Sequence, residues 1–359
     1  MNYYERVGNM HLHSTYSDGW GSPQEIAEAA SRAGLDFLVL TDHNAWPHQH
    51  EGWYNDLLLL VGEEIHDPGY SHHNHFLALN AQRDLAEFAG RTQQLVDALA
   101  EVGGLGFLAH PNEHSGIFTS EPEINWDDWE VRGYTGIELW NYMSEFKSHL
   151  DAVPRALLYA FFPKLAITGP FRETLALWDE LLAQGRVVAI GGSDAHATTY
   201  RLGPIKRQVF PYEYLFRMVN THVLVDAPWS KDVSTDGSLI YAALAAGRAF
   251  VAYDGLYPTT GFTFEASDGR QTFTIGDELP AGPTYRFVAR TPAKARLQLV
   301  HNGFVVAETV GEELHHTSRT PGYYRVQALR SYRGRERGWI YANPIYVAGG
   351  YRRQPTPQS

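Results

Sequence analysis

Short apolar runs alternate with stretches of helical spacing over the first 200 residues. The apolar runs cover residues 35–40, 57–61, 76–79, 105–109, 136–139 and 187–190. The stretches with helical spacing lie near residues 84–101, 145–160 and 173–184. This alternation is typical of strand–helix units in a parallel sheet or barrel, so we expect an α/β fold in this part of the chain.

The first predicted helix has clear start and stop signals. Ser22 and Glu25 have the spacing of a capping box, and Pro23 stands at the first helical position. Apolar positions with helical spacing continue to Ala33, and Gly34 allows the left-handed conformation that often ends a helix. We therefore expect a helix that begins after Ser22 and ends at Gly34.

The pattern changes after about residue 200. A helix-like stretch at 236–246 ends at Gly247, and from about residue 258 only short alternating runs remain. These runs cover 286–289, 297–300, 304–307, 323–328 and 339–347. Asn302-Gly303 between two of them is a strong hairpin signal. We expect a barrel domain over 1–257, a small antiparallel β-sandwich over 258–350 and a tail over 351–359.

Composition removes several classes of site. The 359 residues include 17 histidines and no cysteine, which excludes disulfides, thiolate zinc sites, iron–sulfur clusters and a cysteine nucleophile. The N-terminus lacks a basic-then-apolar signal pattern, and no apolar run approaches the roughly 20 residues that span a bilayer. We expect a cytoplasmic protein that does not enter a membrane.

The net charge of −12 is unevenly distributed. Residues 282–353 hold twelve Lys or Arg and four Glu, a net charge of +8, so the remainder carries −20. A nucleic-acid partner is not expected, because phosphate contacts require a basic face. The basic segment is interpreted as docking on the acidic part or as solvated, with anion binding as the alternative.

Histidines and carboxylates gather at the ends of the predicted strands. Most follow an apolar run directly, where the C-terminal ends of strands meet at one rim. They are His11, His13, Asp18, Asp42, His43, Asn44, Glu64, His110, Asp194 and His196. His75 instead precedes its run, so it reaches the same rim only if that strand is antiparallel.

A lone histidine is usually structural, and we interpret one group in that way: His48, His50, His66, His72, His222, His301, His315 and His316. The converging set is different, because uncompensated burial of so many imidazoles and carboxylates is unfavourable. Mixed imidazole–carboxylate ligation without sulfur suits Zn, Mn or Fe. Nine candidate ligands are too many for one metal ion and enough for two or three.

At these residues the chain resembles the PHP (polymerase and histidinol phosphatase) family. The matching motifs are His11-x-His13 with Asp18-Gly19, Thr41-Asp42-His43, Glu64, His75, Ala109-His110-Pro111 and Ser193-Asp194-Ala195-His196. The resemblance implies a distorted (β/α)7 TIM-like barrel with up to three divalent metal ions. It implies one ion at His11, His13, Glu64 and Asp194, a second at Glu64, His75 and His110, and a third at Asp18, His43 and His196.

Later segments resemble the CehA/McbA-like branch of that family, in which a C-terminal β-domain follows the barrel. The segments are 136–141, 221–225 and 339–347. His73 is an alternative to His75 as a ligand. Asp42 and Asn44 are interpreted as residues that orient ligating imidazoles.

The sequence leaves three functions open. The first is a phosphoesterase in which hydroxide, formed at the metal ions, attacks a small phosphate mono- or diester, with Glu64, Asp194 and His196 as catalytic residues. The second is a carbamate or carboxylic ester hydrolase at the same site. The third is a non-catalytic metal-binding sensor or binding protein. A small-molecule ester is the expected partner, and homo-oligomerisation is left open.

Substrate contacts have two interpretations each. Arg172 and Arg201 are candidate anion clamps, since arginine suits bidentate phosphate recognition, or they are surface ion-pair residues. Trp20, Trp46 and Trp53 stand in loops beside candidate ligands. One interpretation is that these tryptophans form an aromatic wall for the substrate. The other is that they only pack the loops in which they stand.

Overall fold

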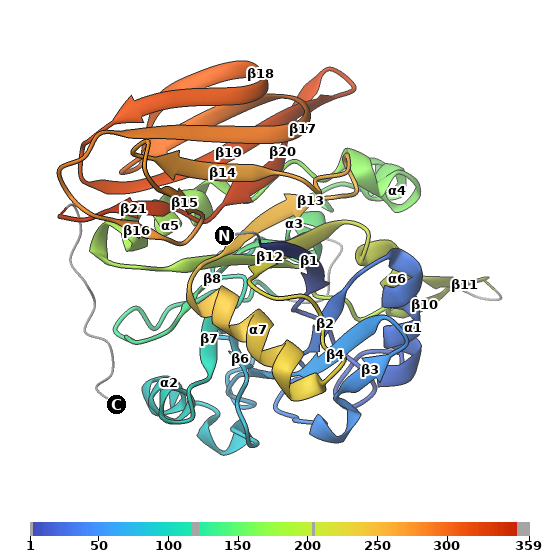
Figure 1. The fold of residues 1–359 in the computed structure, drawn as a ribbon. Coiled ribbons are helices and arrows are strands. Elements are labelled where there is room, and N and C mark those ends of the chain that lie inside the picture. Colours follow the sequence, from blue (N-terminus) through green and yellow to red (C-terminus); the bar gives the residue numbers. More distant parts are fainter. Residues whose placement is uncertain (1–2, 117–121, 203–204, 350–359) are drawn as a thin grey trace.

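The computed structural model describes residues 3–116, 122–202 and 205–349. These residues form a sheet-rich mixed α/β fold with seven α-helices in the described part of the chain (Figure 1). The helices are α1 (Pro23–Ala33), α2 (Thr92–Glu101), α3 (Tyr142–Ser148), α4 (Val153–Phe161), α5 (Arg172–Gln184), α6 (Tyr212–Leu215) and α7 (Val233–Ala245). None of the helices in these ranges is long and apolar enough to cross a membrane.

Two sheets contain the strands of the N-terminal part. The first joins β1 (Tyr4–Asn9), β2 (Phe37–Leu40) and β4 (Leu57–Val61) in parallel, with β3 (Gly52–Tyr54), β12 (Val219–Val225) and β13 (Ala249–Tyr253) added antiparallel. The second has the order β5 (Glu63–Ile65), β6 (Phe76–Leu79), β7 (Leu105–Leu108), β8 (Gly136–Asn141) and β9 (Val188–Gly192). Every predicted apolar run therefore contains a strand.

The sheets meet at two places. β4 and β5 are separated by Gly62 alone. On the other side, the Thr221 hydroxyl of β12 accepts the Gly191 N–H of β9 and donates to the Gly191 carbonyl, both at 2.8 Å. Most of the residues of β2, β4, β6, β7 and β9 are buried, as expected for strands that are covered on both faces.

The first helix begins and ends as predicted. Ser22 accepts the Glu25 N–H, the Glu25 carboxylate accepts the Ser22 N–H at 2.8 Å, and Pro23 opens the helix. Gly34 ends it with φ at +87°. The reciprocal pair satisfies two N–H groups that a helix start leaves unpaired.

Two other predicted helices need correction. The stretch 84–101 holds only a short 3-10 turn at Ala86–Phe88 before α2 begins at Thr92. The stretch 145–160 is two helices, since α3 ends at Ser148 and α4 begins at Val153. Pro154 lies in the first turn of α4, where its missing N–H is tolerated, so it marks a helix start that periodicity alone did not reveal.

The C-terminal strands form antiparallel ladders that continue the first sheet, except for one parallel pair, β16 with β21. They are β14 (Thr263–Ser267), β15 (Thr272–Thr274), β16 (Glu278–Leu279), β17 (Tyr285–His301), β18 (Phe304–Ser318), β19 (Gly322–Tyr332), β20 (Arg335–Ala342) and β21 (Ile345–Val347). A separate two-stranded sheet joins β10 (Thr199–Leu202) to β11 (Ile205–Gln208).

The hairpin prediction is confirmed. Asn302 and Gly303 connect β17 to β18 with φ angles of +49° and +84°, as a type I′ turn requires. The two predicted runs at 286–289 and 297–300 are one strand, β17. A register shift between Arg290 and Ala295 divides it, which explains why alternation stops there.

The C-terminal strands are attached to the N-terminal part by three kinds of contact. β20 pairs with β13 in the shared sheet. The Arg325 guanidinium donates two hydrogen bonds of 2.7 Å to Asp179 on α5. The Asn343 amide contacts the backbone of Ala189 and Ala249. Part of the basic segment therefore docks on the acidic part of the chain.

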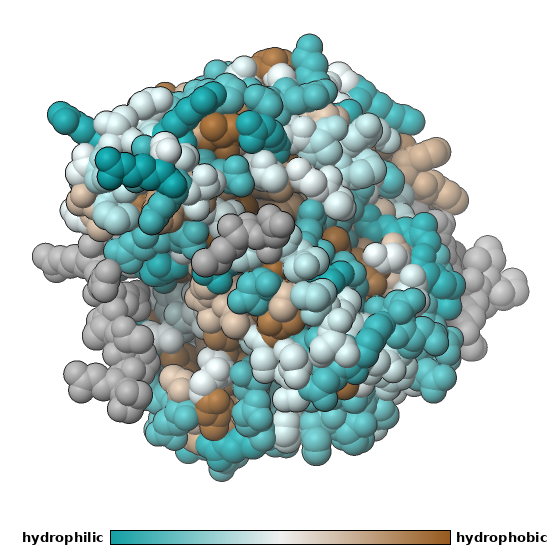
Figure 2. All heavy atoms as spheres, viewed as in Figure 1, coloured by the Kyte–Doolittle hydropathy of each residue, from teal (hydrophilic) through white to brown (hydrophobic). Residues whose placement is uncertain are grey.

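The surface in Figure 2 is mostly hydrophilic, with apolar side chains at the margin where Figure 1 shows α4. Leu157, Leu158, Phe161 and Phe162 are exposed there. The C-terminal strands have an apolar cluster of their own, to which Phe250 and Ala252 of β13 contribute. We therefore propose the division after residue 257 on the basis of cores, although one sheet runs through both parts.

Candidate metal centre

The segment after β1 carries the first two candidate ligands. His11 and His13 are fully buried and extended, and Leu12 between them joins the apolar core. The His13 N–H donates to the Ala195 carbonyl at 2.9 Å, and the Asp194 N–H donates to the His11 carbonyl at 2.8 Å. These backbone bonds bring two segments 182–183 residues apart into contact.

Glu64 lies at the middle of the cluster. Its carboxylate oxygens are within 3.2 Å of five imidazole nitrogens. At Oε1 they are His75 Nδ1 (2.8 Å) and His110 Nε2 (3.2 Å), and at Oε2 they are His43 Nδ1 (3.0 Å), His11 Nε2 (3.2 Å) and His13 Nε2 (3.2 Å). One buried carboxylate thus faces two groups of histidines, one on each oxygen.

Asp194 and Asp18 complete the cluster. Asp194 Oδ1 lies 3.2 Å from His13 Nε2 and 3.5 Å from His196 Nδ1. Asp18 Oδ1 lies 3.2 Å from His196 Nε2, and Asp18 Oδ2 lies 3.8 Å from His43 Nε2. The structure therefore brings all nine predicted ligands together.

The cluster divides into four overlapping groups whose ligand atoms lie within 4.8 Å of one another. They are His13–Asp18–His43–His196, His11–Glu64–His110, His11–His13–Asp194 and His43–Glu64–His75. This overlap is what several ions with shared ligands require. The grouping differs from the one that the resemblance implied, since His43 is close to Glu64 as well as to Asp18.

Despite these short distances, several of the buried atoms make no hydrogen bond of normal geometry among the described residues. They are His11 Nε2, His13 Nδ1 and Nε2, His43 Nδ1, His110 Nδ1 and Glu64 Oε2. Burying such atoms unpaired is unfavourable, so a set this dense fits cations. The donor set, imidazole and carboxylate, is that of Zn, Mn or Fe.

The electrostatic surroundings favour the ionised form of the buried Glu64 and Asp194 carboxylates over the protonated form. Burial alone raises the pKa of Glu64, but the facing histidines outweigh it and hold the pKa well below its usual range. The pKa of Asp194 is lowered in the same way by His11, His13 and His196. Burial lowers the pKa of His110, but Glu64 more than compensates and raises it to about 9. A divalent ion would replace the proton that the His110 ring otherwise holds.

The backbone is strained at two ligands. His110 and Asp194 have φ angles of +26° and +54°, which residues other than glycine seldom adopt. Such conformations persist only where surrounding contacts hold them. At Asp194 those contacts include the bond to His11, and at His110 they include a bond of 2.9 Å from its N–H to Glu138.

His75 reaches the cluster for the topological reason anticipated from the sequence. β6 is antiparallel to both β5 and β7, so its N-terminal end lies at the rim where the other strands end. His73, the alternative, instead pairs with Asp127 at 2.8 Å and stacks on Tyr70.

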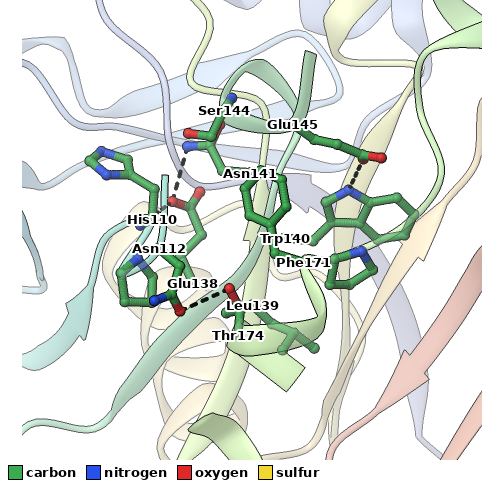
Figure 3. Close-up of a pocket in the computed structure, with 12 residues that line it drawn as sticks. His110, Asn112, Glu138, Leu139, Trp140, Asn141, Ser144, Glu145, Phe171 and Thr174 are labelled. Atoms are coloured by element: carbon green, nitrogen blue, oxygen red, sulfur yellow. Dashed lines mark hydrogen bonds between the residues drawn. The ribbon is translucent and has the colours of Figure 1, made fainter. Parts of the chain in front are cut away.

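Sequence reasoning missed Glu138 as a site residue. Its carboxylate lies 3.0 Å from His11 Nδ1, on the far side of the ring from Glu64, and accepts an Asn141 side-chain hydrogen bond at 3.0 Å. In Figure 3 the Asn141 side chain points toward the Glu138 carboxylate, which also accepts the backbone N–H of His110. Glu138 lies within a fully buried strand, where it looked like part of the core, so no local signal marked it.

Asp42 and Asn44, which were predicted to orient ligating imidazoles, bond to backbone N–H and hydroxyl groups among the described residues. Asp42 accepts from the Ser14 N–H and hydroxyl and from the Ser17 hydroxyl, at 2.6–2.8 Å. Asn44 accepts the His66 N–H through its side chain. They order the loops that carry ligands, because short polar side chains bond readily to nearby backbone.

The predicted substrate contacts have mixed outcomes. Arg172 is exposed at the start of α5, and Arg201 lies on β10, with its side chain outside the described part. Trp20 faces the cavity described below. Trp46 and Trp53 pack against core residues, and Trp53 contacts Trp229, which agrees with the loop-packing interpretation for these two.

A cavity of about 640 Å³ opens beside the cluster. Asp18, His43, Glu64, His75, His110, Asp194 and His196 are among the residues that line it. This volume is within the usual range for small-molecule sites. The residues near the cluster therefore border a space large enough for a small ligand.

Comparison with known proteins gives limited results. No family model matches the chain. A 58-residue stretch is 36% identical to part of the DNA polymerase/3′-5′ exonuclease PolX of Bacillus subtilis, and it covers 16% of this chain and 10% of that protein. The match thus spans about a tenth of the length of that curated relative.

Two solved structures are similar at low sequence identity. One is a two-domain protein from Bacteroides vulgatus described as containing a predicted PHP-like metal-dependent phosphoesterase, at 18% identity and TM-score 0.40, over 95% of both chains. The other is an amidohydrolase from Chromobacterium violaceum with bound sulfate, at 15% identity and TM-score 0.29, over 57% of this chain and 92% of that one.

Proposed function

We propose that this protein is a metal-dependent phosphoesterase of the PHP type that hydrolyses a small phosphate mono- or diester. The observation that carries the proposal is the buried Glu64 carboxylate, whose two oxygens lie within 3.2 Å of five imidazole nitrogens. Two or three Zn, Mn or Fe ions would satisfy this set.

The four overlapping groups name the residues that would hold the ions. When bound, such ions would lower the pKa of water to near 7 and neutralise charge that develops on the phosphate. Glu64 would be shared between two sites, because each of its oxygens faces different histidines.

Asp18, Asp194 and His196 are the candidates for contact with substrate. They line the cavity and are more exposed than the His11–His13 pair behind them. His196 lies between the two carboxylates, with Nε2 toward Asp18 and Nδ1 toward Asp194. This arrangement supports a role for His196 as a metal ligand at the edge of the cavity.

We propose the surrounding architecture as a distorted (β/α)7 barrel of the CehA/McbA-like branch with a C-terminal β-sandwich. The parallel strands β1, β2, β4 and β7–β9 support it, as does the contact of Thr221 with Gly191 between the two sheets. A small-molecule partner, rather than nucleic acid, agrees with the acidic character of the part that holds the cavity.

Hydrolysis of a carbamate or carboxylic ester at the same residues is the second candidate. The apolar side chains of the cavity favour it, since they suit the organic part of such an ester. A non-catalytic metal-binding role is the third. It would be favoured by missing ligand positions, but all nine predicted ligand positions are filled and gathered.

The test combines metal analysis with assays. Purified protein is analysed for metal content, loaded with Mn or Zn, and assayed on p-nitrophenyl phosphate, bis-p-nitrophenyl phosphate and 1-naphthyl methylcarbamate. Two to three ions per chain and chelator-sensitive release of p-nitrophenol from either phosphate ester support the proposal. Negligible p-nitrophenol release with rapid carbamate cleavage would select the second candidate, and bound metal without turnover of any substrate would select the third.

A further inference from the structure

The lining of the cavity beside the metal centre contains two chemically different groups of residues, besides others such as Ser71, His72 and Thr198. One group is the candidate ligands. The other comprises side chains of α3, of Leu150 just after it and of the 209–215 segment. A substrate with its phosphate among the ligands would place its other end against this second group.

The second group is predominantly apolar. Its members are Met143, Phe146, Leu150, Val209, Phe210 and Leu215. Phe146 and Phe210 meet edge to face with ring centroids 4.8 Å apart, and Phe210 also contacts Tyr214. Such a packed aromatic wall keeps its shape when a ligand binds, and it offers dispersion contacts rather than hydrogen bonds.

Lys147 is the one Lys or Arg among the described residues that line the cavity. Its Nζ lies 3.0 Å from Glu113 Oε1, and the same oxygen accepts the Ser144 hydroxyl at 2.7 Å. Glu113 is almost fully buried. Its carboxylate offsets the positive charge of Lys147 in this pair. Among the described lining residues, the wall therefore has no Lys or Arg without an acidic partner that would favour a second phosphate or a carboxylate.

We propose that the substrate is a phosphate ester of an apolar alcohol, with an aromatic or branched group seated on the wall formed by Met143, Phe146, Leu150, Val209, Phe210 and Leu215. The inference rests on the proposed function. In the reaction, water oxygen bonds to phosphorus, the phosphorus–oxygen bond to the alcohol breaks, and a proton from water ends on the alcohol oxygen.

The experiment compares two substrates whose alcohols are primary and of similar basicity. The metal-loaded full chain is assayed on 3-phenylpropyl phosphate and on glycerol 1-phosphate. We expect a kcat/KM ratio of at least about tenfold in favour of the phenylpropyl ester, as hydrophobic pockets give for a few buried methylenes. Equal values for the two esters would overturn the inference and leave the proposed function intact.

Variants locate the effect. Met143 and Leu150 are half-buried, so Met143→Ser and Leu150→Ser should fold. Each should lower kcat/KM for the phenylpropyl ester by about fivefold to tenfold and leave that for glycerol 1-phosphate unchanged. Phe304→Ser is the control, because Phe304 is 77% exposed on β18. An equal loss on both substrates would contradict a role in specificity.

Binding supplies a second readout that does not require turnover. Calorimetry compares 3-phenylpropylphosphonate with propylphosphonate, neither of which can be hydrolysed at the ester position. Tighter binding of the phenyl compound, lost in Met143→Ser, supports the apolar wall even if no phosphate ester is cleaved, in which case the proposed function alone fails. Equal dissociation constants overturn the inference.

Discussion

Glu138 holds the imidazole of His11 from behind: its Oε1 lies 3.0 Å from His11 Nδ1, while Nε2 of the same ring faces Glu64 at 3.2 Å. This arrangement fixes the ring orientation and directs one nitrogen to the centre. Burial lowers the pKa of His11, but Glu138, Glu64 and Asp194 raise it well above its usual value. A carboxylate that accepts a hydrogen bond from a ligating imidazole also makes that imidazole more basic.

We predict that Glu138→Gln weakens metal binding by about 10- to 100-fold, because the amide keeps the shape but loses the charge. Competition with a chromogenic chelator measures the affinity. Glu130→Gln is the control, since Glu130 is exposed. Unchanged affinity in Glu138→Gln would show that the contact only packs the strand.

Glu64→Gln should lower the number of bound ions and reduce turnover by at least about a hundredfold, because both oxygens face histidines and an amide nitrogen cannot ligate. Elemental analysis of the purified variant checks the first effect. A full complement of metal in this variant would refute the sharing of Glu64 between sites.

His75 and His73 form a matched pair for mutation. His75→Ala should lower metal content, because its Nδ1 lies 2.8 Å from Glu64, whereas His73→Ala should retain the metal and lose only the surface pair with Asp127. Metal content and thermal stability of both variants decide this. The opposite ranking would identify His73 as the ligand.

Protonation of His222 should make the stability of the protein depend on pH, and this effect does not involve the metal ligands. It is buried between Glu5, at 2.6 Å from Nδ1, and Asp254, at 3.2 Å from Nε2. Burial lowers its pKa, but Asp254 and Glu5 raise it to about 9, against an ordinary value of 6.5. The stability from this cluster is therefore complete below about pH 6.5 and is lost as pH rises through about 9.

Thermal unfolding of metal-loaded protein from pH 6 to 9.5 tests this. The wild type should lose stability on the order of 2 kcal/mol more than His222→Gln over that interval, and the variant should be less stable at pH 6. His315→Gln, at an exposed position, is the control. Parallel curves for wild type and His222→Gln would contradict a charged His222.

The sequence was most informative where function depends on position along a strand. Ligands such as His110 directly follow buried runs, and the need for an antiparallel strand at His75 could be stated before the ladder was seen. Such patterns are local, and strand ends converge for geometric reasons.

The sequence was less informative where a role depends on distant partners. Glu138 acts through a residue 127 positions away, and His222 is charged because Glu5 and Asp254 come from other segments. Similarly, the pairing of β13 with β20 joins segments about 90 residues apart. Nothing in the local pattern at these positions distinguishes a partner from a packed core residue.

The pairing of β13 with β20 affects how the protein responds to truncation and to heat. Cutting the chain after residue 257 would strip β13 of one neighbour and uncover Phe250 and Ala252, which are fully buried. A protein shortened in this way would expose an unpaired sheet edge and be prone to aggregation. The C-terminal strands are thus part of the same sheet, and we expect both parts of the protein to unfold in one thermal transition.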